Sequence, residues 1–289
     1  MSFWSAYSFW RDSMLAVLLA AAMCGYLGVY VVLRRVVFVG AALTQISGVG
    51  IATAFWLASF PALASHGPHG GEIPFLLEPQ VFSLVFAVAG AVLFSFNRGG
   101  RRLASETVVG LGWVIASAAV LLILASKRIT EEAHEVDDLL YGSAVLVAPG
   151  QVALLAGVVA AVLLVHVLFF KEFFFVTYDL EMAQTLGYRT LLWEVLLYTT
   201  LGVGISFAVR TVGALPAFAF LVVPAASAQV LVKRAAYMFP LAVLFAVMAG
   251  ALGYYLSFEH QLPTGAAIVA ASALFLLPGA ARRLLRRDG

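Results

Sequence analysis

Two hydrophilic segments carry the side chains best suited to bind a metal ion. Residues 65–72 hold two histidines three positions apart, and residues 131–138 hold six acidic or imidazole side chains within eight positions. Imidazole and carboxylate groups are common protein ligands of divalent transition metals. Either segment is equally compatible with a solvated turn, and the acidic one with a contact for a basic partner surface. The candidate metal ligands are His66, His69, His134, Glu135 and Asp138.

A third group of polar side chains is uncharged and lies within an apolar run rich in small residues. Thr44, Gln45 and Ser47 offer hydroxyl and amide groups that either bind a polar cargo or hydrogen-bond neighbouring helices. Pro224 interrupts another apolar run. A proline in a membrane helix frees a carbonyl group, so this residue is either a structural kink or part of a cavity wall. These four residues are candidates for a substrate pathway.

The sequence contains no pattern typical of a catalytic centre. It has no glycine-rich phosphate loop with a lysine, no nucleophile elbow, no paired-histidine helix motif and no cysteine cluster. Cys24 is the single cysteine, so the chain cannot form an internal disulfide. Any energy source must therefore lie on another polypeptide, which favours a transport or binding subunit over an intramembrane enzyme.

Long apolar runs must position these residues. The chain is 63% hydrophobic and 11% charged, with a mean hydropathy of +1.01. A helix needs about 20 apolar residues to cross a hydrocarbon core of about 30 Å. We predict an all-α polytopic membrane protein with eight to nine transmembrane helices, a single domain over residues 1–289, and no nucleic-acid partner. The apolar runs are Ser13–Leu33, Val36–Ser59, Gln80–Phe96, Thr107–Ala125, Gln151–Phe170, Leu191–Val209, Thr211–Val232, Tyr237–Ser257 and Leu262–Leu277.

Charge asymmetry predicts the orientation of the chain. If the N-terminus lies outside, thirteen of the seventeen Lys and Arg residues fall on the inner side, and the outer segments hold nine acids against four bases. Basic residues accumulate in cytoplasmic loops of membrane proteins. The N-terminus is therefore predicted to be external, the C-terminus cytoplasmic and the number of spans odd.

The longest inner connection, Phe175–Arg189, is predicted to contain a short amphipathic helix. Thr177 or Asp179 can cap its N-terminus, and Gly187 can end it. Its polar face carries acidic and amide side chains instead of the Lys and Arg expected of a helix on a lipid surface. This favours docking of a soluble partner. The apolar face consists of Leu180, Ala183 and Leu186.

This segment resembles the coupling segment of the ABC-type permeases that import zinc, manganese or iron. The shared pattern is an aromatic residue, Asp, an acid two positions later, Ala and a Leu-Gly pair. Further matches follow the order of the family along most of the chain: Leu27–Arg35, Glu106–Gly110, Tyr141–Ser143, Val212–Leu215, Val223–Ala228 and Leu262–Ala266. The residues that the resemblance assigns to coupling are Tyr178, Asp179, Leu180, Glu181, Ala183, Leu186 and Gly187.

The resemblance implies a permease that works by alternating access in a bacterial inner membrane. Its partners would be a cytoplasmic ATP-binding-cassette subunit, an extracytoplasmic substrate-binding protein, a second permease copy (identical or closely related) and membrane lipid. ATP would bind the partner subunit, and this chain would hold no cofactor.

The chain departs from the family where the second span begins. The family has Asp and His four residues apart, where this chain has Ala41 and Gln45. A divalent ion in a low-dielectric region needs compensating charge, and these two residues supply none. Either the metal site lies elsewhere, or the cargo is a metal chelate or another small polar solute.

A different class of function also stays open, namely an ion-coupled secondary transporter or a membrane scaffold. Secondary transporters usually place ionisable groups near the middle of the membrane. The central parts of all nine apolar runs lack Asp, Glu, Lys and Arg, which counts against this class.

Overall fold

The computed structural model describes residues 7–60, 78–97, 104–126, 147 and 149–277. All regular structure in these ranges is helical, as the uninterrupted apolar runs predict. The helices are α1 (Tyr7–Leu33), α2 (Val37–Ala58), α4 (Pro79–Phe96), α5 (Ser105–Leu124), α7 (Pro149–Leu168), α8 (Phe170–Tyr178), α9 (Leu180–Thr185), α10 (Thr190–Val212), α11 (Ala214–Leu231), the short η3 (Ala235–Tyr237), α12 (Met238–His260) and α13 (Thr264–Leu274).

Eight of these helices are long and apolar enough to cross a membrane, within the described ranges. They correspond to the first eight predicted apolar runs. The ninth run, Leu262–Leu277, yields α13, which has 11 residues. At 1.5 Å per residue such a helix is about 16 Å long, too short to cross the hydrocarbon core alone. The prediction of eight to nine transmembrane helices is confirmed. Eight is an even number, so the helices of the described ranges that are long enough to cross do not meet the predicted odd number of spans.

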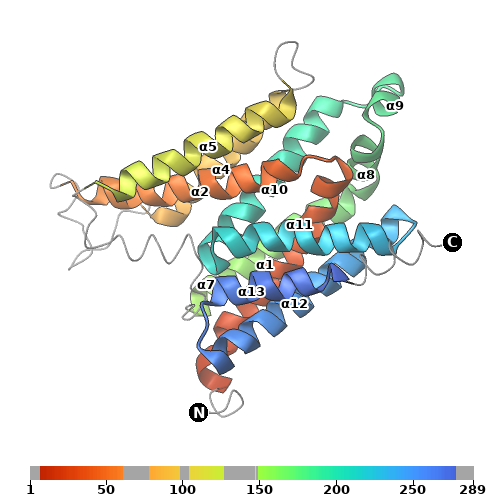
Figure 1. Cartoon of the computed structure of the whole chain (residues 1–289). Helices are drawn as coiled ribbons and strands as arrows, with labels where there is room; N and C mark the ends of the chain where they lie inside the picture. Colours follow the sequence, from red (N-terminus) through yellow and green to blue (C-terminus); the bar gives the residue numbers. More distant parts are fainter. Residues whose placement is uncertain (1–6, 61–77, 98–103, 127–146, 148, 278–289) are drawn as a thin grey trace.

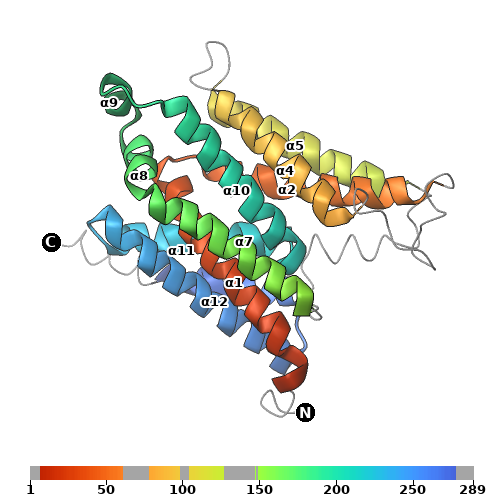
Figure 2. The ribbon, with the colours of Figure 1, turned by 180° about the vertical axis from the view of Figure 1, so that it is seen from behind.

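The helices form two groups joined by α10. In the first group α2 packs against α4 and α5, and in the second α1 packs against α7, α11 and α12. α10 contacts α4 on one side and α1 and α11 on the other. The first group lies at an angle to the second, and α8 and α9 lie at one extremity of the molecule (Figures 1 and 2).

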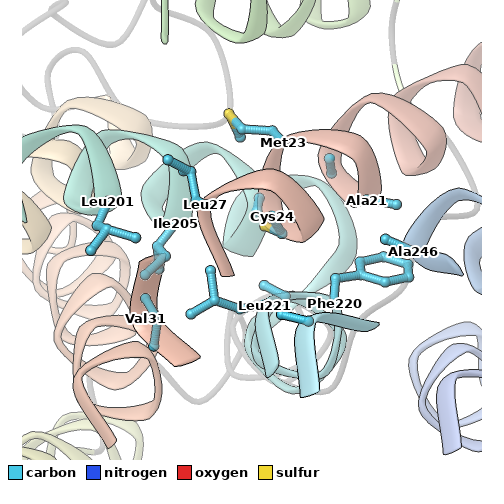
Figure 3. Packing of buried hydrophobic residues seen from close by; sticks show 14 of the residues in the cluster. Ala21, Met23, Cys24, Leu27, Val31, Leu201, Ile205, Phe220, Leu221 and Ala246 are labelled. Carbon is cyan, nitrogen blue, oxygen red and sulfur yellow. The ribbon is translucent and has the colours of Figure 1, made fainter. Parts of the chain in front are cut away.

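The core lies where α1 meets α10 and α11. Cys24 and Leu27 of α1 are fully buried, with Ile205 of α10 and Leu221 of α11 close by (Figure 3). Gly28 allows this approach, because a Cβ atom there would lie 1.8 Å from the carbonyl oxygen of Leu221. Small residues let helices approach closely in lipid, where van der Waals packing drives their association.

The boundary between α10 and α11 differs from the sequence prediction. The charge of Arg210 suggested a break at that residue, but α10 continues to Val212. The chain breaks at Gly213, whose φ of 91° is favourable for glycine and strained for residues with a Cβ atom. Backbone geometry, and not the position of the charged residue, sets this boundary.

Candidate functional site: a neutral cavity and an exposed helix

Ala41, Thr44 and Gln45 of α2 line an open-sided cavity of about 450 Å³, here called the Gln45 cavity. Ala41 and Gln45 share its wall because residues four apart lie on the same face of a helix. α5 and α11 supply the other walls. The lining residues are Phe38, Ala41, Thr44, Gln45, Trp113, Ser117, Val120, Leu121, Ala214, Leu215 and Phe218.

Every side chain that lines this cavity is uncharged. The Thr44 hydroxyl donates a hydrogen bond of 2.8 Å to the carbonyl of Ala41 within α2. Its oxygen can still accept a hydrogen bond from a cargo. The Ser117 hydroxyl is buried and has no hydrogen-bond partner among the described residues. A buried polar group without a partner costs about 1–3 kcal/mol. A polar cargo or a water molecule that pairs with Ser117 would recover that free energy.

The chemistry of the cavity suits a polar or hydrated cargo. Gln45, Thr44 and Ser117 offer amide and hydroxyl oxygens, which are hard ligands of the kind that magnesium, calcium and manganese accept. None of them carries the charge that would compensate a bare divalent cation in a low-dielectric region. The cavity can therefore hydrogen-bond a hydrated or chelated ion, and it does not provide an Asp/His pair.

The two other pathway candidates lie away from this cavity. The Ser47 hydroxyl is 2.7 Å from the hydroxyl of Ser83, which lies 3.1 Å from that of Ser206. Ser206 also accepts a hydrogen bond of 3.2 Å from the Gln80 amide. These contacts join α2, α4 and α10. Ser47 therefore hydrogen-bonds neighbouring helices, which is the second of the two uses that the sequence predicts for it. Pro224 is buried inside α11 and is absent from the lining of the Gln45 cavity.

The histidine and acidic candidates fall outside the part of the chain that the structure describes. His66, His69, His134, Glu135 and Asp138 all lie in the segments 61–77 and 127–146. Within the described ranges, no three His, Cys, Asp or Glu side chains lie close enough together to hold a metal ion.

Sequence reasoning missed the part of the cavity that α5 supplies. Trp113 and Ser117 lie one helical turn apart on α5 and both face the cavity. Ser117 is a hydroxyl in the middle of the apolar run Thr107–Ala125. A single polar side chain in the middle of a membrane span indicates a polar surface at that position. The run alone does not show which helices pack against that surface.

The predicted amphipathic helix forms as α9, with Asp179 as its N-cap. The side chain of Asp179 accepts a hydrogen bond of 2.9 Å from the backbone N–H of Met182. Thr177, the other candidate cap, belongs instead to α8, a separate short helix that the sequence analysis did not foresee. Asp179 has an extended backbone between the two helices, so its side chain can turn back onto the first turn of α9.

Gly187 ends α9, as predicted. Its φ of 81° places it in the left-handed region, which glycine adopts without a Cβ clash. The N–H of Gly187 donates to the carbonyl of Gln184 at 3.0 Å, and the N–H of Tyr188 donates to that of Ala183 at 3.1 Å. This pair of bonds is the Schellman arrangement, which satisfies the last carbonyls of a helix.

The exposed apolar face of α9 differs from the predicted one. Ala183 is fully buried and Leu180 is half-buried, because this side of the helix packs against α8 and α10. The exposed apolar side chains are Tyr178, Met182 and Leu186, with exposed fractions of 71%, 52% and 60%. Met182 and Leu186 are four residues apart and form a stripe that we call the α9 stripe, whereas Tyr178 is the last residue of α8 and is separated from α9 by the extended Asp179.

The chain is similar to known membrane proteins over nearly its full length. It is 26% identical over 274 residues to the manganese transport system membrane protein MntC of Halalkalibacterium halodurans, covering 94% of this chain and 87% of the relative. It is 24% identical over 272 residues to the manganese import system permease protein ScaB of Streptococcus gordonii, covering 94% and 90%. The structure of PsaBC from Streptococcus pneumoniae in complex with Fab superimposes with a TM-score of 0.79 at 21% identity, covering 96% of this chain and 94% of that one.

These matches establish the fold and the location of the protein. The structural match confirms the polytopic helical fold, and the eight spanning helices together with bacterial relatives place the chain in a bacterial plasma membrane. The sequence model of the ABC 3 transport family matches residues 6–283. Because this range includes almost every residue, the chain belongs to the ABC 3 transport family.

Proposed function

We propose that this chain is the membrane-spanning permease of an ABC importer for a divalent metal ion, with manganese as the first ion to test. The observation that carries the proposal is a cavity with three polar side chains between spanning helices of a chain in the ABC 3 transport family. Relatives named as manganese transport proteins support the choice of ion. In this proposal the cargo crosses through the Gln45 cavity, and Thr44, Gln45 and Ser117 contact it.

The energy for transport would come from a cytoplasmic ATPase that contacts α9. An exposed apolar stripe on a capped helix at one extremity of the molecule suits such a contact, because burial of apolar surface drives protein association. The acidic Glu181 beside the stripe would then face the partner. ATP would bind that partner, and this chain would hold no cofactor.

A second copy of the chain, or a close relative, would close the open side of the cavity. Leu121 lines the cavity yet is 65% exposed, and Trp113 is 40% exposed. A cavity that opens along α5 toward lipid cannot carry a polar cargo, because lipid tails offer no hydrogen bonds. A partner helix against α5 would exclude lipid, and an extracytoplasmic binding protein would deliver the cargo from outside.

A chelated ion is the second candidate cargo, and the neutrality of the cavity favours it. A chelator or a retained water shell would supply the oxygen ligands and charge that Ala41 and Gln45 do not. The volume of about 450 Å³ exceeds the space that a bare ion requires. Both cargoes would use the same cavity and the same partners.

Isotope uptake distinguishes the two cargoes. We would express the chain with the ATPase and binding protein encoded beside it, in a bacterium that lacks its own manganese importer. We expect energy-dependent uptake of manganese-54 as the chloride, abolished by Met182→Asp with Leu186→Asp. Uptake of carbon-14 citrate together with manganese at a fixed ratio would assign the chelate. Absence of uptake for manganese, zinc and iron in both forms would contradict metal import.

A further inference from the structure

A second cavity, of about 570 Å³, lies where the ends of several helices meet, and we call it the Arg34 cavity. Its walls come from the α1–α2 turn, the end of α4, the start of α5, the end of α8 and the first turns of α10. The apolar spans end at this level. Spanning helices end near the boundary between hydrocarbon and headgroups, so the cavity lies at the depth of phospholipid headgroups.

Three buried polar atoms on the walls of this cavity have no hydrogen-bond partner among the described residues. They are Nη1 of Arg34, Nδ2 of Asn97 and Oγ1 of Thr177. The side chain of Arg34 is 10% exposed, and Thr177 is 8% exposed. The N–H groups of a guanidinium or an amide can only donate hydrogen bonds, whereas a hydroxyl can either donate or accept one. The walls of the cavity therefore hold three donors for a ligand rich in acceptors.

The neighbours of Arg34 hold its guanidinium in place. Its Nη2 is paired with the carboxylate of Glu194, and its Cζ lies 5.9 Å from the ring centroid of Tyr198. The pair leaves Nη1 available, and a planar guanidinium can serve two oxyanions through different N–H groups. Arg34 can thus keep Glu194 while it donates to a ligand in the cavity.

The charges on the walls do not suit a ligand with several negative charges. Arg34 and Arg35 are matched in number by Glu106 and Glu194. Glu194 is already paired with Arg34, and Arg35 and Glu106 are both exposed, where water and salt screen their charges. A phosphodiester carries one negative charge, whereas a polyphosphate would bring several charges that these walls do not balance.

The apolar part of the walls favours a ligand with a hydrocarbon tail. Phe38 lines the cavity and is 58% exposed, and Phe94 lies on the same wall. We propose that the Arg34 cavity binds the phosphodiester of an anionic membrane phospholipid. Arg34, Asn97 and Thr177 donate to the phosphate oxygens, and an acyl chain lies along Phe94. Pockets between membrane helices that carry basic side chains bind lipid headgroups.

The bound lipid would connect the pathway helix to the segment that carries α9. Thr177 lies at the end of α8, two residues before the Asp179 cap of α9. Arg34 lies at the turn that leads into α2. A phosphate held by both residues links the movement of α2 to the position of α9.

Native mass spectrometry of the purified full chain tests this site. The probes are phosphatidylglycerol and a diacylglycerol with the same acyl chains. The informative variant is Asn97→Ala with Thr177→Val, because it removes two donors and keeps the Arg34–Glu194 pair, whereas Arg34→Gln would leave Glu194 buried without its counterion. The matched control is Ser95→Ala, since Ser95 lines the same cavity but its hydroxyl already donates to the Val92 carbonyl at 2.7 Å.

We expect the double variant to bind phosphatidylglycerol about tenfold more weakly than the unaltered chain, from the loss of two hydrogen bonds. The control variant should match the unaltered chain, and diacylglycerol should be lost on mild activation. Equal retention of phosphatidylglycerol by the double variant and the unaltered chain would overturn the proposal. Binding of inorganic phosphate that displaces phosphatidylglycerol and depends on Asn97 and Thr177 would assign the cavity to a free oxyanion and overturn the lipid assignment.

Discussion

Ala41 and Gln45 stand one helical turn apart on α2 and face the same neutral cavity. Their chemistry decides whether a bare divalent ion can rest there. An alanine methyl group offers no ligand, and an amide oxygen carries no formal charge. The remaining polar groups, Thr44 and Ser117, are hydroxyls. The site can therefore pass a polar cargo without holding a bare ion tightly.

This residue-scale account predicts a gain of metal binding on a double substitution. Ala41→Asp with Gln45→His places a carboxylate and an imidazole on one face of α2, where both side chains line the cavity. Calorimetry on purified protein should detect tight binding of manganese or zinc. Each single variant supplies only one new ligand and should bind at least about tenfold more weakly, a difference of about 1.4 kcal/mol.

The unaltered chain serves as the reference for this experiment. It should show no tight binding of a divalent ion in the Gln45 cavity. A structure in which a bare divalent ion, without its water shell or a chelator, is coordinated by Gln45, Thr44 or Ser117 of the unaltered chain would refute the neutral-cavity account.

At the scale of elements, α9 has a capped start, a Schellman end and one exposed apolar stripe. The stripe is made of Met182 and Leu186. The opposite side of α9 packs against α8 and α10, so these two are the apolar side chains that α9 offers to a partner. The structure therefore shifts the proposed contact from Leu180 and Ala183 to Met182.

Met182→Asp with Leu186→Asp should abolish co-purification with the ATPase. Two charges would replace apolar side chains at the contact, and loss of their burial weakens binding by about 100-fold or more. Membrane insertion should be unchanged, because both side chains are exposed in the isolated chain. Gln184→Glu changes an exposed side chain of α9 outside the stripe and is the matched control. Undiminished co-purification of the double variant would rule out docking through the α9 stripe.

The crossing of α1 and α11 depends on Gly28. A Cβ atom at this position meets the carbonyl oxygen of Leu221 at 1.8 Å, so Gly28→Ala forces the two helices apart. Overpacking of this kind costs about 1–3 kcal/mol, which should appear as a lower midpoint of thermal unfolding in detergent. Gly110→Ala is the control, because nothing lies within 4 Å of its added Cβ atom. Equal midpoints for the two variants would contradict the proposed packing.

For the whole molecule, the sequence predicts the number and positions of the spanning helices, but it does not predict which residues come together in the site. Apolar runs mark spanning helices because the thickness of the membrane fixes their length. Asp179 and Gly187 mark the ends of α9 because caps act locally. The Gln45 cavity, however, is built from α2, α5 and α11, which are distant in the sequence. No local pattern shows that Ser117 faces Gln45, or that Ser47 turns instead toward Ser83.

Orientation is a second property of the whole molecule, and it remains a prediction from charge. With Cys24 changed to Ser, a cysteine introduced by His69→Cys should react with a membrane-impermeant thiol reagent in intact cells. A cysteine introduced by Arg101→Cys should react only after the cells are opened. The reverse labelling pattern would invert the topology and place α9 on the outer side, where no ATPase could reach it.

The central claim is that cargo crosses through the Gln45 cavity, and a cavity-filling substitution tests it most directly. Ala41→Trp places a large side chain in the cavity, whereas Leu164→Trp adds the same side chain to an exposed position on α7 outside the lining. The measurement is manganese-54 uptake by cells that express the complete transporter. The account predicts that Ala41→Trp abolishes uptake while the ATPase still co-purifies, and that Leu164→Trp, on α7 at a position that is 59% exposed and away from α5, transports normally. Normal uptake by Ala41→Trp would contradict the account.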